Sequence, residues 1–189
     1  MKLNRLFGLA IILLSSQSWS STFIDDDIKP VYLGFDVGYQ VASDDSYSKS
    51  PDGVMYSVYA GFMFDRNWGW DVGYQFNNGM DAQLTGNLNT ITVESRVLTS
   101  TINRQWKMNN KINLYSKLGF GYWFVNKKDT FLIDSDSEGI SPVVNLGGHY
   151  SLNSSVNINF GYQYMPRIGD NAIGQYDGHS FVVGPVFYF

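Results

Sequence analysis

The sequence contains no cysteine, and charged residues make up only 16% of its 189 positions. The lack of cysteine excludes disulfide scaffolds, thiolate metal sites and cysteine nucleophiles. Long apolar runs are also missing, because the longest, residues 6–14, has nine residues. A membrane-spanning helix needs roughly 18. Any insertion into a membrane must therefore use strands.

A surplus of basic residues is absent as well. The net charge of −4 argues against a nucleic-acid partner, which would require a basic patch. Aromatic residues make up 16% of the chain, which excludes an intrinsically disordered protein. The length fits one domain.

Residues 1–20 have the pattern of a secretory signal peptide. Lys2 and Arg5 precede the apolar stretch, and Ser18-Trp19-Ser20 supplies small residues at a cleavage site. We expect cleavage after Ser20, which leaves residues 21–189 as a single exported domain.

The exported part alternates between apolar and polar residues with the period of two that half-buried strands show. Eight segments have this pattern: 31–41, 54–64, 68–76, 91–100, 112–124, 144–151, 156–164 and 181–189. Short polar turns at 65–67, 107–110 and 152–154 alternate with long polar loops at 42–52, 77–89, 126–139 and 166–178. Such alternation is typical of outer-membrane barrels. The sequence predicts an all-β fold, an eight-stranded antiparallel up-and-down transmembrane β-barrel.

A short repeat lies in the odd-numbered segments. Asp36-Val37-Gly38-Tyr39-Gln40 recurs at 71–75, more loosely at 119–123, and again at 159–163. Alternation directs its glycine inward and its tyrosine outward near one rim. We therefore predict an outward aromatic girdle at that rim, formed by Tyr39, Tyr74, Tyr122 and Tyr162.

The charged residues within the segments indicate which face meets lipid. They share a face with Gly, Asn and Gln, whereas the opposite face carries bulky aromatics that eight strands could not enclose. The aromatics are therefore predicted to face lipid. In segment 91–100, Val93 and Val97 are assigned to this outer face. Buried charges must pair, so we predict a lumenal charge cluster that blocks the barrel, made of Asp36, Asp71, Glu94, Arg96 and Lys117.

With these features, the sequence resembles the eight-stranded outer-membrane β-barrel family that includes OmpA-type transmembrane domains and OmpX/Ail-like proteins. The resemblance rests on the signal peptide, the repeat and the apolar alternation of the last nine residues. It implies location in the bacterial outer membrane, contact with lipid and lipopolysaccharide, and recognition by the outer-membrane assembly machinery. The implied assembly signal is the terminal row Phe181, Val183, Phe187 and Phe189. Pro185 departs from the pattern and suggests a bulge in the last strand.

The favoured function is non-catalytic: a monomer that acts through its surface loops on an unknown extracellular ligand, in adhesion, contact with a host or the environment, or envelope integrity. A narrow channel or small-solute transporter is the alternative. A lipid-modifying enzyme is a third reading, because His149-Tyr150-Ser151 resembles the His-x-Ser pattern of lipid A deacylases. Asp134 to Glu138 imitates the start of a calcium loop, but its twelfth position is Asn145. We expect no catalytic, cofactor or metal site.

Overall fold

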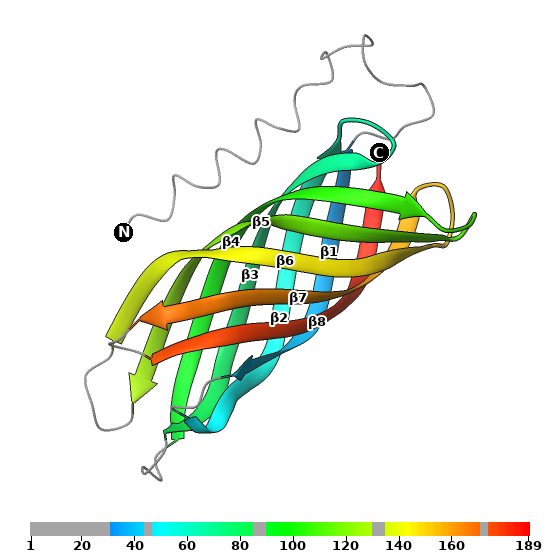
Figure 1. Cartoon of the computed structure of the whole chain (residues 1–189). Helices are drawn as coiled ribbons and strands as arrows, with labels where there is room; N and C mark the ends of the chain where they lie inside the picture. The colour runs from blue at the N-terminus through cyan, green and yellow to red at the C-terminus, as the bar shows by residue number, and fades with distance from the viewer. Residues whose placement is uncertain (1–30, 44–46, 85–89, 130–134, 171–173) are drawn as a thin grey trace.

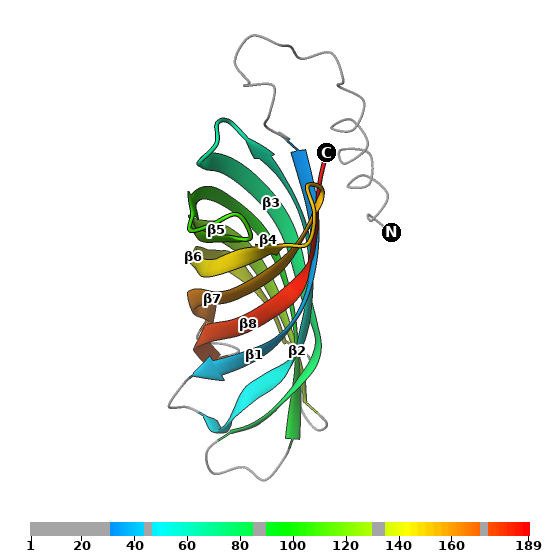
Figure 2. The same cartoon turned by 90° about the vertical axis from the view of Figure 1, so that its right-hand side faces the viewer.

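The computed structural model describes residues 31–43, 47–84, 90–129, 135–170 and 174–189. These residues form one closed barrel in which each strand pairs antiparallel with the next and β1 pairs with β8 (Figures 1 and 2). The predicted eight-stranded antiparallel barrel is confirmed. The predicted signal peptide 1–20 and Asp134 lie outside the described residues. The strands are β1 (Val31–Ser43), β2 (Tyr47–Met63), β3 (Trp68–Leu84), β4 (Thr90–Lys107), β5 (Ile112–Asp129), β6 (Ser135–Ser151), β7 (Val156–Asp170) and β8 (Gly174–Tyr188).

The three predicted short turns share one construction. In each, four residues separate the two strands, and the second of them is an Asp or Asn. Its side chain accepts the backbone N–H groups of the residues two and three positions ahead, at 2.6 to 2.9 Å. Such side-chain bonds replace backbone partners that a tight reversal leaves unpaired. The three acceptors are Asp65, Asn109 and Asn153. The end of the barrel that carries these turns is called the turn end below, and the opposite end the loop end.

The four segments predicted as long loops are mostly strand, so this expectation is wrong. β1 continues to Ser43 and β2 begins at Tyr47, and the hairpins β3–β4, β5–β6 and β7–β8 are extended in the same way. Their polar composition resembles that of loops. Ladder pairing still satisfies the backbone N–H and C=O groups of these residues, whatever their side chains. The strands reach 18 residues in β4 and β5, well beyond the roughly 9–11 that cross a bilayer.

Alternation holds along the barrel wall. Large apolar side chains such as Phe35, Trp70 and Phe120 are exposed on the outer face, at 45%, 42% and 66%. The residues between them point into the lumen and are mostly buried. The part of the chain that the structure describes contains no helix long and apolar enough to cross a membrane.

The predicted bulge at Pro185 is wrong. Pro185 pairs with Ile158 of β7, and the β7–β8 register is regular on both sides of it. The β1–β8 pairing resumes beyond Pro185 in the same register, with Gly34 opposite Val186 and Val37 opposite Val183. A proline lacks the N–H that a ladder uses, so it can interrupt pairing without inserting a residue.

Candidate functional site

The interior of the barrel is filled by side chains in three successive layers. A cluster at the turn end contains Tyr32, Tyr59, Met63, Val186 and Tyr188. A polar network follows, and an apolar cluster lies at the loop end. An eight-stranded lumen is just wide enough for side chains to fill it.

An ion pair lies in the polar layer. The Nζ atom of Lys117 on β5 is 2.9 Å from Oδ2 of Asp71 on β3, and the two side chains are 10% and 5% exposed. The ammonium group also lies 4.6 Å from the ring centre of Tyr59 and 5.0 Å from that of Tyr115. Aromatic faces attract a desolvated cation. The buried positive charge of Lys117 is thus held by a carboxylate and two rings.

Asp71 has further partners on its second oxygen. Oδ1 accepts hydrogen bonds from the Tyr32 hydroxyl and, at 3.1 Å, from Nδ2 of Asn103. The same amide group donates to the Tyr32 hydroxyl at 2.6 Å. Charged buried groups are stabilised by such additional bonds, so Asp71 links β1, β3, β4 and β5 at one point.

Asp36 lies inside as well, 6% exposed. Its Oδ2 accepts a hydrogen bond from Nδ2 of Asn159 at 2.8 Å, and its Oδ1 has no partner within the described residues. Asp36, Asp71 and Lys117 line a cavity of about 50 Å³ in this layer. A cavity of this size has room for water that could hydrogen-bond to Oδ1.

The glutamines of the repeat cross-link the barrel, a role that the sequence did not reveal. Gln75 of β3 and Gln163 of β7 exchange two amide hydrogen bonds, of 2.6 and 2.9 Å, across the lumen. Gln40 accepts one from Asn77 at 2.5 Å. The repeat could have indicated this role, because its alternation places every glutamine inward and buried amides require partners.

The predicted lumenal placement of Glu94 and Arg96 is wrong. Both lie on the outer face of β4, in line with Leu98 and Ile102, which are 46% and 53% exposed. Val93 and Val97, assigned to the outer face, are instead buried inside. The loop-end lumen is apolar, so valines fill it, and the charged side chains of Glu94 and Arg96 turn toward the outside. The predicted five-residue cluster therefore divides into Asp36, Asp71 and Lys117 inside and Glu94 and Arg96 outside.

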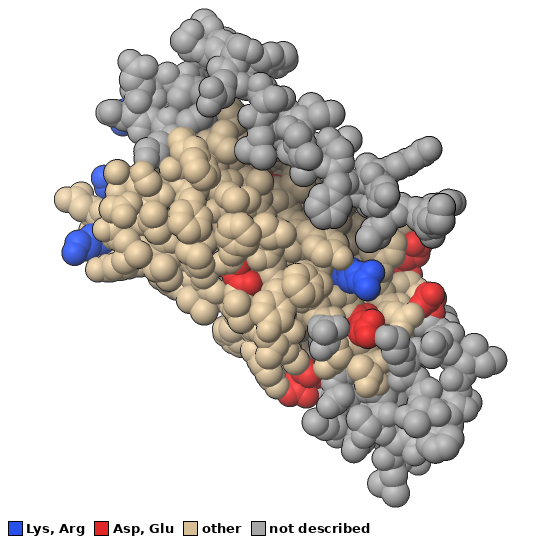
Figure 3. All heavy atoms as spheres, turned by 180° about the vertical axis from the view of Figure 1, so that it is seen from behind, with Lys and Arg blue, Asp and Glu red and all other residues tan. Residues whose placement is uncertain are grey.

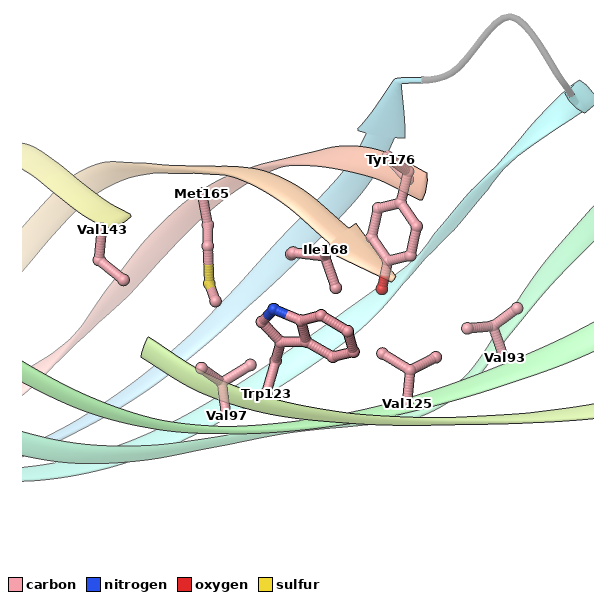
Figure 4. Close-up of a cluster of buried hydrophobic side chains, with 9 residues drawn as sticks. Val93, Val97, Trp123, Val125, Val143, Met165, Ile168 and Tyr176 are labelled. Carbon is pink, nitrogen blue, oxygen red and sulfur yellow. The ribbon is translucent and has the colours of Figure 1, made fainter. Parts of the chain in front are cut away.

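The loop-end cluster closes the lumen around Trp123. In Figure 4 the indole lies between Val97 and Val125 on one side and Met165 and Ile168 on the other. Nε1 of Trp123 donates to Oγ of Ser141 at 3.0 Å. Trp123 occupies the position of the glutamine in the looser copy of the repeat, residues 119–123, so this copy supplies an apolar anchor instead of an amide. The cluster comprises Ala42, Val93, Val97, Trp123, Val125, Val143, Met165, Ile168 and Tyr176.

His149 is enclosed at the turn end and is only 2% exposed. Its ring lies 4.9 Å from that of Tyr115, and its Nδ1 is 3.3 Å from the Tyr188 hydroxyl. His149 and Ser151 share the lumenal parity of β6. A lipid ester would have to reach them from inside the barrel, so this placement does not favour a lipid hydrolase.

The remaining predicted residues lie on the outer face. The four girdle tyrosines point outward, with Tyr39 46% and Tyr74 40% exposed, and the hydroxyl of Tyr162 lies 2.6 Å from Nδ1 of His179. Their function as a girdle stays a prediction, as does the assembly signal. The side chains of that signal also point outward, with exposed fractions of 64%, 53%, 37% and 67% for Phe181, Val183, Phe187 and Phe189.

The β7–β8 hairpin carries local strain at the loop end. Arg167 has a φ of 53°, where non-glycine residues are uncommon, next to a register shift between Met165 and Ile168. Asp177 holds this backbone by accepting the Arg167 N–H at 3.0 Å and the Tyr164 hydroxyl at 2.7 Å. These hydrogen bonds lower the pKa of Asp177 because they stabilise its charged form, and the bond from the Arg167 N–H has the larger effect. The hairpin is thereby fixed by a carboxylate.

Charge separates along the barrel axis. Residues 42–52, 77–89, 126–139 and 166–178 of the loop-end hairpins contain ten acidic and four basic residues, a net charge of −6. Among the residues that the structure describes, the turn end carries Arg66, Arg104, Lys107 and Lys111 against one acid, Asp65. On the face visible in Figure 3, basic atoms gather at the turn end, and most acidic atoms lie toward the loop end beside one basic side chain.

The sequence also matches the profile of a known protein family. The profile described as "Outer membrane protein beta-barrel domain" matches residues 7–189. The chain belongs to this family. It is therefore a small β-barrel of the outer-membrane type, and its exposed apolar wall is the face that meets lipid.

Solved structures of this family's fold are similar over most of the chain at low sequence identity. Neisserial surface protein A (NspA) has a TM-score of 0.68 at 17% identity, covering 84% of this chain and 97% of that one. The outer membrane protein OprG of Pseudomonas aeruginosa has 0.61 at 15% identity, covering 85% and 96%. Ail of Yersinia pestis, in complex with the heparin analogue sucrose octasulfate, has 0.55 at 16% identity, covering 85% and 99%. These likenesses show the fold alone. No curated protein matches the chain in a sequence comparison.

Proposed function

We propose that this protein is a non-conducting, non-catalytic barrel that acts through its loop-end hairpins, in adhesion, contact with a host or the environment, or envelope integrity. The observation that carries the proposal is the filled lumen: an apolar cluster, an ion-paired polar layer and an aromatic cluster follow one another along the axis. A solute would have to displace all three. What remains available for recognition is the surface beyond the membrane, where a rigid scaffold presents variable segments.

In this proposal a monomer exported by a signal peptide is the working unit. Its outer face contacts lipid and lipopolysaccharide, and its terminal row is recognised by the assembly machinery. The alternative of a channel is supported within the polar layer by a cavity of about 50 Å³. The lipid-modifying alternative would need His149 on the outer face, and His149 is buried inside.

The charge of the loop-end hairpins suggests the chemistry of the ligand. Ail was solved with a sulfated, strongly anionic ligand. In this chain, the four loop-end segments given above have a net charge of −6, which repels a polyanion and attracts a cationic surface. A ligand with a basic surface, such as a lysine-rich protein segment, is therefore the better fit.

This proposal can be tested with the purified barrel in nanodiscs of zwitterionic lipid. A lysine-rich peptide should bind and heparin should not, and binding should weaken as salt rises. Neutralising the hairpin β5–β6 (Asp129→Asn, Asp134→Asn, Asp136→Asn, Glu138→Gln) should weaken peptide binding. The matched control neutralises the turn end (Arg66→Gln, Lys107→Gln, Lys111→Gln) and should not weaken it. Binding of heparin, or peptide binding that ignores the β5–β6 acids, would contradict the proposal.

A further inference from the structure

A hollow at the turn end, here called the vestibule, has a volume of about 810 Å³. It lies between the three short turns, with Met63 and Tyr188 of the turn-end cluster among its lining residues. Pockets of this size accommodate ligands well beyond single ions.

The lining of the vestibule is basic and rich in amides. Arg66, Lys107 and Lys111 line it together with one acid, Asp65, which gives a net charge of +2, and six other lining residues carry amide side chains. Ammonium, guanidinium and amide N–H groups all donate to carboxylates. An acidic peptide is therefore the ligand class that matches this surface.

The chain itself contains such a peptide a few residues before its first strand. Asp25-Asp26-Asp27 is the only run of three acids in the sequence, and Lys29 reduces the charge of residues 25–29 to −2. The first strand residue, Val31, lies at the same rim, where its carbonyl accepts the Phe189 N–H at 2.9 Å. The two net charges are equal and opposite.

The distances permit the contact. The acids precede Val31 by four to six residues, which can span at most about 14–21 Å at roughly 3.5 Å per residue. Eight strands spaced about 4.8 Å apart and tilted by about 40° enclose a barrel about 16 Å across. The acids can therefore reach every basic group on the rim. A short tether also gives the segment an effective concentration in the millimolar range.

We propose that the exported chain's own acidic segment, Asp25 to Asp27, occupies the turn-end vestibule and pairs with Arg66, Lys107 and Lys111. The segment would then shield the basic mouth from other anions at the turn end. This inference needs only the cleavage expected after Ser20 and is independent of the ligand at the loop end.

The absence of cysteine allows a direct test by disulfide trapping in the folded chain 21–189. Ile24→Cys keeps all three acids and is combined with Asn110→Cys, which lines the vestibule. The matched control combines it with Met108→Cys, on the same turn but 63% exposed and outside that lining. Folding of both variants is first verified on SDS gels. A closed barrel pairs its backbone groups internally and should resist SDS until it is heated, so heated and unheated samples of a folded variant should migrate differently.

The vestibule pair should cross-link about tenfold faster than the control pair at low salt, as three partly exposed charge pairs on a short tether would produce. The difference should vanish at high salt and in Asp25→Asn/Asp26→Asn/Asp27→Asn. It should return when Asp25, Asp26 and Asp27 are changed to Lys and Lys107 and Lys111 to Glu. Equal rates for the two pairs, or a preference insensitive to these charges, would overturn the proposal. Equally tight binding of an aspartate hexapeptide to the wild-type and neutralised chains would also overturn it, because the vestibule would then be open to external acids.

Discussion

Asp71 on β3 and Lys117 on β5 form an ion pair inside the barrel although β4 lies between their strands in the sheet. The pair connects strands that share no backbone ladder, and Tyr32 and Asn103 extend the connection to β1 and β4. Together with the apolar cluster around Trp123, it fills the lumen that a channel would need to keep open.

Removing one member of this pair should destabilise the barrel. We expect Lys117→Met to lower the free energy of unfolding by about 3–5 kcal/mol, because it leaves Asp71 buried without its counter-charge. Asp71→Asn/Lys117→Met should recover part of that loss. Urea unfolding in lipid vesicles measures both. Glu94→Gln is the control, since an outer-face charge contributes about 1 kcal/mol or less. A larger loss in Glu94→Gln than in Lys117→Met would contradict the assignment of faces.

The loop-end cluster should depend on its indole. Trp123→Ala removes a side chain that is 4% exposed. It should lower the free energy of unfolding by about 3–5 kcal/mol, the usual range for a buried large aromatic residue. Phe124→Ala changes the neighbouring outer-face residue, 43% exposed, and should cost less. Equal losses in the same unfolding assay would show that Trp123 is not the anchor.

A glycine at a close backbone approach gives a third test. A Cβ atom at Gly184 would lie 1.8 Å from the backbone oxygen of Phe35, which cannot move without shifting β1. Gly184→Ala should therefore destabilise the barrel by about 1–3 kcal/mol or more. At Gly178 the nearest atom is Cδ1 of Ile168 at 3.0 Å, a flexible side-chain end, so Gly178→Ala should be milder. The same unfolding assay compares the two variants. A larger loss of stability in Gly178→Ala than in Gly184→Ala would contradict this packing.

Assembly in cells should depend on the last residue. Deleting Phe189 removes an outward side chain and the backbone bond to Val31, and we expect lower amounts of folded protein in the outer membrane at native expression. Phe189→Tyr keeps an aromatic side chain and the backbone bond and serves as the control. Unchanged amounts after the deletion would argue against an assembly signal in the terminal row.

The sequence predicted the architecture and the outward face of seven strands, because aromatics such as Phe35, Trp70 and Phe120 recur with period two. It failed in β4, where Val93 and Val97 fill an apolar section of lumen and Glu94 and Arg96 turn outward. Periodicity establishes that two faces differ, but which one is inside depends on the neighbours across the lumen. The Gln75–Gln163 bridge was missed for the same reason, since its partners are 88 residues apart in the chain.

The central claim is that the lumen is filled, and conductance through the purified protein in planar bilayers tests it most directly. The account predicts no steady conductance from the inserted wild-type barrel at either polarity. It also predicts that Trp123→Ala combined with Lys117→Ala and Asp71→Ala, which empties two layers together, increases the current. Steady wild-type conductance that rises with the amount of inserted protein and is unchanged in the triple variant would contradict the account and favour the channel.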